Sequence, residues 1–205
     1  MAVTMSKIYR YVVRVDKGFA PNPYNQFCTL ACCKPKIRKG ASPGDWVVGF
    51  ANSSRGNSRL IYAMQVGEVM PLNEYFEDKR FRGRIDNIYY ENNGELKQKK
   101  NKFHDEKDYE TDVGGKNVLI AKDGMWWYFG NKAPDLIVEI CNDDAKAKYS
   151  RVEAIDRLLF NGRNYMVNGL LGDEIGILYS YLMNNWPDGG KIGEPFDAPI
   201  HPKCG

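Results

Sequence analysis

The sequence predicts an α+β fold, built as a curved sheet or partial β-barrel with flanking helices and a C-terminal helix. Ala41–Asp78 reads, in order, as a turn, a buried strand, a polar loop, a second strand and a short helix. Ile8–Val15 is rich in β-branched and aromatic residues that alternate as in a strand. Asp173–Trp186 carries apolar residues at helical spacing. We expect one domain over residues 1–205, with a polar insert at about 79–116.

The first strand leads into a loop and then a helical turn. Phe19–Gln26 is expected to be a loop, because Pro21 and Pro23 push the residues before them away from helical geometry. Lys34–Lys39 is expected to form a helical turn, with Pro35 near its first position, where the missing N–H is harmless.

The central part of the chain alternates turns and strands. Pro43–Asp45 has turn chemistry, and Trp46–Phe50 and Leu60–Val69 follow as strands. Leu72–Asp78 is predicted to form a short helix. In the insert, Asn92–Gly94 favours a hairpin between the strands on either side, Ile85–Tyr90 and Glu95–Lys99. We expect the insert to be a mobile excursion from the barrel.

The second half of the chain adds the last strands and the C-terminal helix. Asn117–Ala121 is a predicted buried strand, and Lys122–Gly124 is a predicted turn into the aromatic run Met125–Phe129. Leu136–Cys141 is expected to be a further short strand. Arg151–Phe160 has apolar residues at helical spacing.

Composition and charge narrow the function only slightly. The formal net charge of +3 is weak evidence for a polyanionic partner. No stretch approaches the roughly 18–20 uninterrupted apolar residues of a membrane span. The N-terminus also lacks the pattern of a secretory signal. We therefore expect a cytoplasmic protein with no membrane partner.

The five cysteines are expected to be reduced, because an odd number without a secretory signal argues against a disulfide framework. Cys28, Cys32 and Cys33 do not have a common zinc spacing, and the only histidines are His104 and His201. Small, partly buried hydrophobes are the simpler interpretation, with a structural zinc site as the alternative. We expect no metal and no cofactor.

The usual enzyme signatures are missing from the sequence. It contains no phosphate-binding glycine loop, no dinucleotide fingerprint and no Gly-x-Ser-x-Gly elbow. With two histidines, the sequence argues against a histidine-based triad. Catalytic residues therefore stay unassigned. If the protein is an enzyme, the candidate acid–base or nucleophilic groups are Asp16, Asp45 and Cys32.

Aromatic and basic residues suggest a ligand. In a strand, the consecutive aromatic residues from Trp126 would point to alternate faces, so that one pair fills the core and the other lines a cleft. Flat rings beside cations suit an extruded base and its phosphates, although all these rings could instead belong to the core. The amide of Asn22 could read a base edge. The predicted base-binding residues are Pro21, Asn22, Pro23, Tyr24, Tyr62, Met64, Trp126, Trp127 and Tyr128, and the predicted phosphate-binding residues are Lys34, Lys36 and Arg38.

Several sequence blocks together carry a family resemblance. They are YVVRVDKGFAPNPY, CTLACCKPKIRKGASPGDWVVGF, RLIYAMQVGEVMPLNEYF, VLIAKDGMWWYFG, and the tail LYSYLMNN with GGKIGEP. Their order resembles the second nucleotide modification associated domain family. The Gly44-Asp45 turn and the strands and helix after it also resemble the PUA-like fold of EVE domains.

The resemblance implies a PUA-like protein linked to modified bases in DNA, in a bacterial or phage modification or conflict system. The shared loop residues that it implies as site candidates are Asp16, Gly18, Ala20, Pro21, Asn22, Pro23, Cys32, Lys34, Pro35, Ile37 and Arg38.

Three hypotheses follow for the function. The leading one is binding of a nucleotide or a modified base in nucleic acid, most simply DNA. The second is an enzyme that acts on nucleotides or modified bases. The third is a protein-interaction module that uses exposed aromatic residues as hot spots. The sequence does not decide the oligomeric state.

Overall fold

A computed structural model of the chain describes residues 6–140, 153–159 and 173–197. The strands of its main sheet are β1 (Ile8–Val13), β2 (Asn22–Tyr24), β3 (Phe27–Leu30), β4 (Trp46–Ala51), β5 (Leu60–Pro71), β8 (Asn117–Tyr128) and β9 (Gly190–Lys191). The strand order is β1-β4-β5-β8-β3-β2, and β9 also pairs with β8. Within the described residues, β1 and β2 are the ends of this order, so the seven-stranded sheet is open and not a closed barrel.

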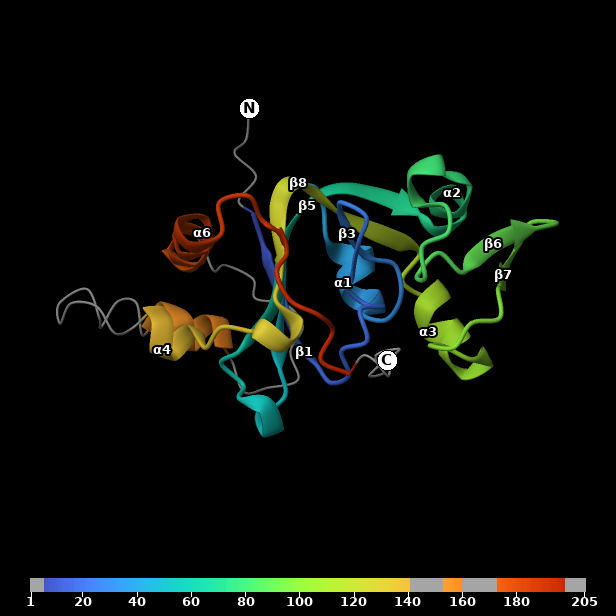
Figure 1. The fold of residues 1–205 in the computed structure, drawn as a ribbon. Coiled ribbons are helices and arrows are strands. Elements are labelled where there is room, and N and C mark those ends of the chain that lie inside the picture. Colours follow the sequence, from blue (N-terminus) through green and yellow to red (C-terminus); the bar gives the residue numbers. More distant parts are fainter. Residues whose placement is uncertain (1–5, 141–152, 160–172, 198–205) are drawn as a thin grey trace, which may run out of the picture.

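Helices flank the sheet, so the α+β class is confirmed. They are α1 (Pro35–Gly40), α2 (Leu72–Glu77), α3 (Tyr109–Val113), α4 (Leu136–Ile140) and α6 (Asp173–Asn185), and residues 153–159 are also helical. Figure 1 places α4 and α6 on one side of the sheet, and α1, α2 and α3 on the other. No helix in the described part of the chain has the length and apolar character needed to cross a membrane.

Most of the predicted elements are confirmed. β1, β4 and β5 lie where their alternating or apolar runs predicted strands, and α1 begins at Pro35 as expected. The C-terminal helix α6 buries Leu178 and Leu182 of its predicted apolar stripe against the sheet. For Arg151–Phe160, the described residues 153–159 are helical.

Three local predictions were wrong. The predicted loop Phe19–Gln26 contains β2, which pairs with β3 through a turn at Asn25 and Gln26. The predicted turn Lys122–Gly124 is a bulge inside the continuous strand β8. It bulges because Met64 and Val66 of β5 face Trp126 and Ala121 of β8, so that four residues of β8 oppose one of β5.

The predicted strand Leu136–Cys141 is instead the helix α4, as far as it is described. The side chain of Asp135 accepts hydrogen bonds from the backbone N–H groups of Ile137 and Val138, at 3.2 and 3.4 Å. An N-terminal cap of this kind favours a helix over the strand propensity of Leu-Ile-Val.

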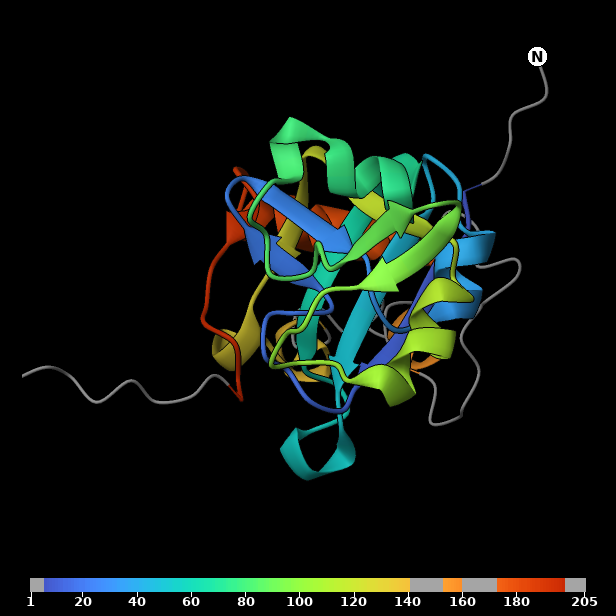
Figure 2. The same ribbon diagram turned by 90° about the vertical axis from the view of Figure 1, so that its right-hand side faces the viewer.

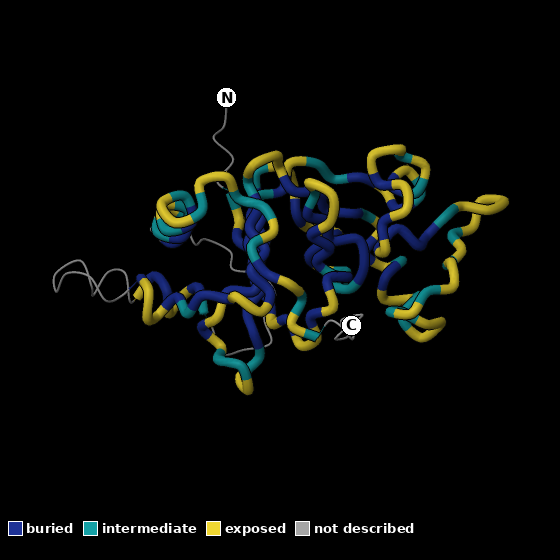
Figure 3. Tube along the Cα trace, in the orientation of Figure 1, coloured by how far each residue is buried: buried dark blue, intermediate teal, exposed yellow. Residues whose placement is uncertain are grey.

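The insert, residues 79–116, is packed against the sheet and is not a separate excursion. Its hairpin pairs β6 (Tyr89–Asn92) with β7 (Glu95–Gln98) through Asn93 and Gly94, which both have positive φ. The predicted turn is therefore confirmed, but the first strand begins at Tyr89 and not at Ile85. Figure 2 shows this hairpin and α3 in front of the sheet. Phe81, Ile88 and Tyr89 are buried in a second apolar cluster with α2. The hairpin tip, residues 91–95, is exposed, and so are residues 105–107 (Figure 3).

Candidate functional site

A cavity of about 660 Å³ lies between the edge strand β1, the start of α1 and the insert. Its lining residues are Tyr11, Val12, Val13, Arg14, Val15, Lys17, Phe19, Ala20, Cys33, Lys34, Pro35, Lys36, Ile37, Phe103, His104, Asp108 and Thr111. Residues 11–20 and 33–37 form one wall, and residues 103–111 of the insert form the other. The cavity therefore exists because the insert docks beside the sheet edge.

The cavity wall carries an excess of positive charge. Arg14, Lys17, Lys34 and Lys36 line it, against the single carboxylate of Asp108 among its lining residues. The ammonium of Lys34 lies 4.4 Å from the centre of the Tyr11 ring, and burial lowers the pKa of Lys34. A partly desolvated ammonium beside an aromatic face favours an anionic ligand over a neutral one.

Aromatic rings from both walls of the cavity pack against one another. Phe19 and Phe103 stack with their centroids 4.7 Å apart, and the His104 ring packs edge-on against Phe19 at 4.7 Å. These contacts fix the imidazole plane at the cavity wall. The backbone N–H of His104 also donates to the side-chain oxygen of Asn101 at 2.8 Å.

Cys33, His104 and Asp112 form a chain of polar contacts at this wall. The Cys33 Sγ lies 3.4 Å from Nε2 of His104, and Nδ1–H on the opposite side of the ring donates to Oδ2 of Asp112 at 2.6 Å. The backbone N–H of Cys33 donates to Oδ1 of the same carboxylate at 2.5 Å. One buried carboxylate therefore holds both the thiol-bearing backbone and the imidazole.

The backbone at Cys33 adopts a conformation that L residues rarely take. Cys33 and Lys34 have φ angles of 58° and 43°, between β3 and the first turn of α1. Consecutive left-handed non-glycine residues cost free energy, on the order of 1–3 kcal/mol each. The bond from Cys33 N–H to Asp112 stabilises this conformation and fixes the direction of the thiol.

The electrostatics of His104 and Asp112 favour a charged imidazole on His104. Burial alone would lower the pKa of His104, but its hydrogen bonds to Asp112 and Cys33 outweigh this and raise it to about 10. Burial likewise opposes ionisation of Asp112. The bonds from His104, from Cys33 N–H and from the Tyr89 hydroxyl (2.8 Å) nevertheless lower its pKa.

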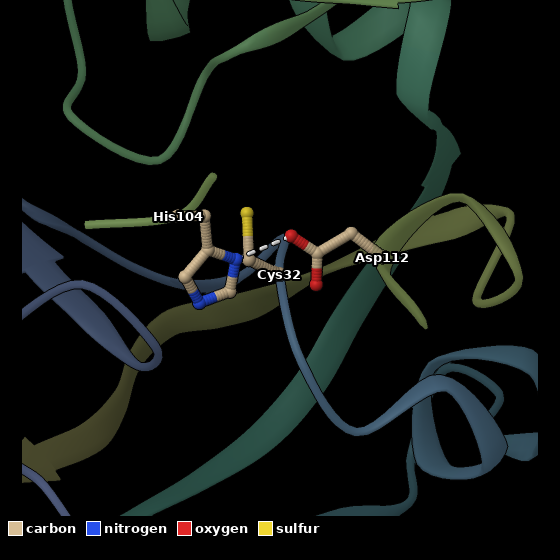
Figure 4. A group of neighbouring side chains, drawn as sticks. All are labelled: Cys32, His104 and Asp112. Carbon is tan, nitrogen blue, oxygen red and sulfur yellow. Dashed lines mark hydrogen bonds and ion pairs between the residues drawn. The ribbon is translucent and has the colours of Figure 1, made fainter. Parts of the chain in front are cut away.

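Cys32, His104 and Asp112 also bring three possible metal-ligand atoms within 4.8 Å of one another. Figure 4 shows the imidazole and the carboxylate joined to each other, with no interaction drawn from the Cys32 sulfur to either. The separation of 2.6 Å between His104 Nδ1 and Asp112 leaves no room for an ion between them, because metal–ligand bonds are about 2.0–2.2 Å each. Burial also raises the pKa of Cys32 well above its usual range, which favours a thiol over a thiolate ligand. The donor set therefore fits a hydrogen-bonded chain better than a metal.

Two of the predicted phosphate-binding residues, Lys34 and Lys36, line the cavity, and the third does not. Arg38 is 0% exposed. Its guanidinium donates to the backbone carbonyls of Ala31, Cys33, Asn117 and Asp112. These four acceptors use the donors that a phosphate contact would need, so Arg38 acts as a structural cross-link.

The predicted base-binding residues do not line this cavity. Tyr62, Met64, Trp127 and Tyr128 are 0% exposed, and Trp126 is also buried. They belong to the main apolar core, which also includes residues of α4 and α6. This is the alternative in which the whole aromatic run belongs to the core.

The loop candidates have structural contacts of their own. The Asn22 amide nitrogen donates to the buried carboxylate of Asp86 at 2.7 Å, so it supports β2 from inside. Pro21 and Pro23 are buried beside it, and Tyr24 is 55% exposed outside the cavity lining. These residues position the chain next to the site without facing it.

The three catalytic candidates named from the sequence are also held in structural roles. Asp45 accepts from the backbone N–H groups of Lys7 and Ser42, at 2.8 and 2.9 Å, and fixes its turn. Asp16 is buried and accepts from the Tyr128 hydroxyl at 2.5 Å, and burial raises its pKa. Cys32 is 0% exposed.

Sequence reasoning missed Cys33, His104 and Asp112 as a group. The Cys33 thiol contacts a ring 71 positions away in the sequence, that of His104. The Cys33 backbone N–H bonds a carboxylate 79 positions away, that of Asp112. No local spacing signals such a group. A cysteine directly before a proline-initiated basic turn was the one feature in the sequence that marked Cys33.

Comparisons with known proteins give one match. No curated protein and no solved structure matches the chain. The model of the nucleotide modification associated domain 2 family matches residues 5–161, which include the whole cavity wall and the Cys33–His104–Asp112 group. The chain therefore belongs to the nucleotide modification associated domain 2 family.

Proposed function

We propose that the protein binds a phosphate-bearing nucleotide in the cavity between β1, α1 and the insert. The observation that carries the proposal is the set of four cations, Arg14, Lys17, Lys34 and Lys36, around a cavity with a single carboxylate among its lining residues. Family membership supports it, because the family's description links it to nucleotide modification.

The size and lining of the cavity suit one nucleotide. Its volume of about 660 Å³ lies within the range typical of small-molecule sites, roughly 300–1,000 Å³. The ammonium groups of Lys34 and Lys36 would contact phosphate oxygens. The apolar wall that includes Tyr11, Phe19 and Phe103 would contact the base or sugar.

The natural form of the ligand is part of the same proposal. We take it to be a modified nucleotide within nucleic acid, most simply DNA, in a bacterial or phage base-modification system, with the sheet as a PUA-like scaffold. Family membership supports the link to modification, and the positive wall suits a polyanion.

The double variant Lys34→Ala/Lys36→Ala tests the proposal. Calorimetry or thermal shift would measure binding of nucleoside 5′-monophosphates, with and without base modifications, and of short single-stranded DNA. We expect the variant to bind at least about tenfold more weakly and its salt slope for DNA to fall by about one to two, because two phosphate contacts are lost.

Lys39→Ala is the matched control, since Lys39 is an exposed lysine of α1 that does not line the cavity. It should leave the affinity within about twofold of the wild type. Equal affinities for the wild type and the double variant would refute nucleotide binding in this cavity.

A further inference from the structure

We infer that Cys33 is a catalytic nucleophile, activated by His104 and positioned to attack an acyl carbon of an anionic substrate in the cavity. The class of substrate, a phosphate-bearing molecule, rests on the function proposed above. The nucleophile itself is argued from its own contacts.

The geometry is that of an activated thiol. Nε2 of His104 lies 3.4 Å from the Cys33 Sγ, within reach for a proton to pass between sulfur and nitrogen. Because Asp112 is a carboxylate and can only accept at Nδ1, the ring presents its other nitrogen to the sulfur. A cysteine, a histidine and an orienting carboxylate perform acyl transfer on unrelated folds.

Asp112 is a positioning residue in this arrangement. It is 0% exposed and holds three donors: Nδ1–H of His104, the backbone N–H of Cys33 and the Tyr89 hydroxyl. It therefore fixes the imidazole ring and the thiol relative to each other. It also stabilises the imidazolium that forms when the thiol loses its proton.

Access distinguishes Cys33 from its neighbours. Cys28 and Cys32 are 0% exposed, and burial raises the pKa of both thiols. Cys33 is half-buried and lines the cavity with His104. Among the cysteines that the structure describes, it alone combines access to the cavity with a histidine partner.

The reaction balances with water as the second reactant. In the reactive form the thiol proton already resides on His104, as the imidazolium that Asp112 stabilises, and the electron pair of the thiolate forms a bond to the acyl carbon. The electron pair of the breaking C–O or C–N bond leaves with the leaving group, which takes the proton from Nε2. Water then attacks the thioester, His104 takes a proton from the water, and that proton returns to the departing sulfur. The cations of the wall would offset the negative charge on the acyl oxygen.

Alkylation rates test the nucleophile without a known substrate. Iodoacetamide labelling of Cys33, located by mass spectrometry, would be followed from about pH 5 to 9. We expect Cys33 at about pH 6 to react at least about tenfold faster in the wild type than in His104→Gln. Asp112→Asn should shift the pH profile toward that of an ordinary thiol. The titratable and charged groups that interact with Cys33 are Tyr11, Cys32, Lys34, Arg38, His104 and Asp112, and the cavity wall adds Arg14, Lys17, Lys36 and Asp108.

Cys32→Ser is the matched control, because it removes the neighbouring thiol and leaves the His104 contact in place. It should keep the Cys33 rate within about twofold. Circular dichroism would establish that each variant is folded. A wild-type pH profile equal to that of a free thiol and unchanged by His104→Gln would overturn the inference. So would stoichiometric zinc that Cys32→Ser removes.

The acyl step is tested with acetyl phosphate, which carries an acyl carbon and a phosphate leaving group. We expect acetylation of Cys33 that hydroxylamine removes, absent in Cys33→Ser and at least about tenfold lower in His104→Gln. Acetylation confined to lysines, and stable to hydroxylamine, would overturn acyl transfer as the reaction.

The two proposals can fail separately. Lys34→Ala/Lys36→Ala should lower the ratio of the iodoacetate rate to the iodoacetamide rate several-fold, because the cations attract only the anionic reagent, whereas a change in the thiolate fraction affects both reagents equally. Fast, histidine-dependent alkylation in a protein that binds no nucleotide supports the nucleophile and refutes the nucleotide site. Nucleotide binding by a protein whose Cys33 is unreactive supports the nucleotide site and refutes the nucleophile.

Discussion

The guanidinium of Arg38 joins β3, α1, the insert and the start of β8 through four backbone carbonyl groups. Gly115 lies against it so closely that a Cβ there would collide with the Arg38 side chain. The same cross-link holds Asp112 and Cys33 in place, so Arg38 supports the site without facing the cavity.

Substitution of Arg38 should therefore affect folding more than binding. We expect Arg38→Met to lower the free energy of unfolding by at least about 3 kcal/mol, because buried carbonyls that lose their donor cost about 1–3 kcal/mol each. Urea unfolding measures the change. Lys39→Met, on the same helix but exposed, should stay within about 0.5 kcal/mol of the wild type. An Arg38→Met protein as stable as the wild type would contradict this role.

For single residues, the sequence showed that the turn after β3 is basic, but not which group each basic side chain contacts. The basic turn after β3 was recognised, and Lys34 and Lys36 do line the cavity. Arg38 is in the same turn, yet it points inward, where its guanidinium bonds backbone carbonyls of Asp112 and Asn117. Which lysine or arginine of such a turn meets solvent depends on the surrounding segments, and these are distant in the sequence.

Single elements followed local signals where these were consistent. The alternation in β1, the apolar run of β4 and the stripe of α6 all agree with their environments. Local signals did not predict α4, because its helix depends on the capping carboxylate of Asp135. They did not predict the bulge of β8 either, because it depends on the register with β5. The Asn-Gly hairpin in the insert was predicted because its turn chemistry is local.

The cap of α4 gives a test at the scale of one element. Asp135→Ala removes the acceptor for the N–H groups of Ile137 and Val138. The free energy of unfolding should fall by about 0.5–2 kcal/mol, the usual cost of losing an N-terminal cap. Urea unfolding would measure it. Asp135→Asn keeps an acceptor and should restore most of the stability. If the two variants lose the same amount, the helix does not depend on this cap.

In the whole molecule, His104 and Asp112 of the insert both contact Cys33 beside α1, and the charges of these two residues link stability to pH. The pKa of His104 rises from 6.5 to about 10 in the folded state. Its contribution to stability is therefore complete below about pH 6.5 and is lost as the pH rises through about 10. The pKa of Asp112 is lowered from 3.8, so its contribution holds above that pH and is lost on acidification.

Urea unfolding at about pH 6 and about pH 9.5 should show this dependence. We expect the wild type to lose stability between the two pH values, and His104→Gln to be less stable at the lower pH and nearly independent of pH over that interval. An equal fall in stability in both proteins would show that other groups cause it.

The overall class, an α+β fold, followed from the order of local patterns. The cavity did not, because it forms only where residues 11–37 and 103–111 meet. The apolar residues that dock the insert, such as Phe81 and Tyr89, look in the sequence like scattered members of a polar stretch.

The residues that bind anions and the residues that orient the thiol come from two different stretches of the chain. Arg14, Lys17, Lys34 and Lys36 all come from the first forty residues, whereas His104 and Asp112 come from the insert. A relative that kept the early stretch but carried a different insert would still attract anions and yet lack the proton acceptor for its thiol. Replacement of one surface segment would thus separate recognition from reactivity, with the sheet left intact.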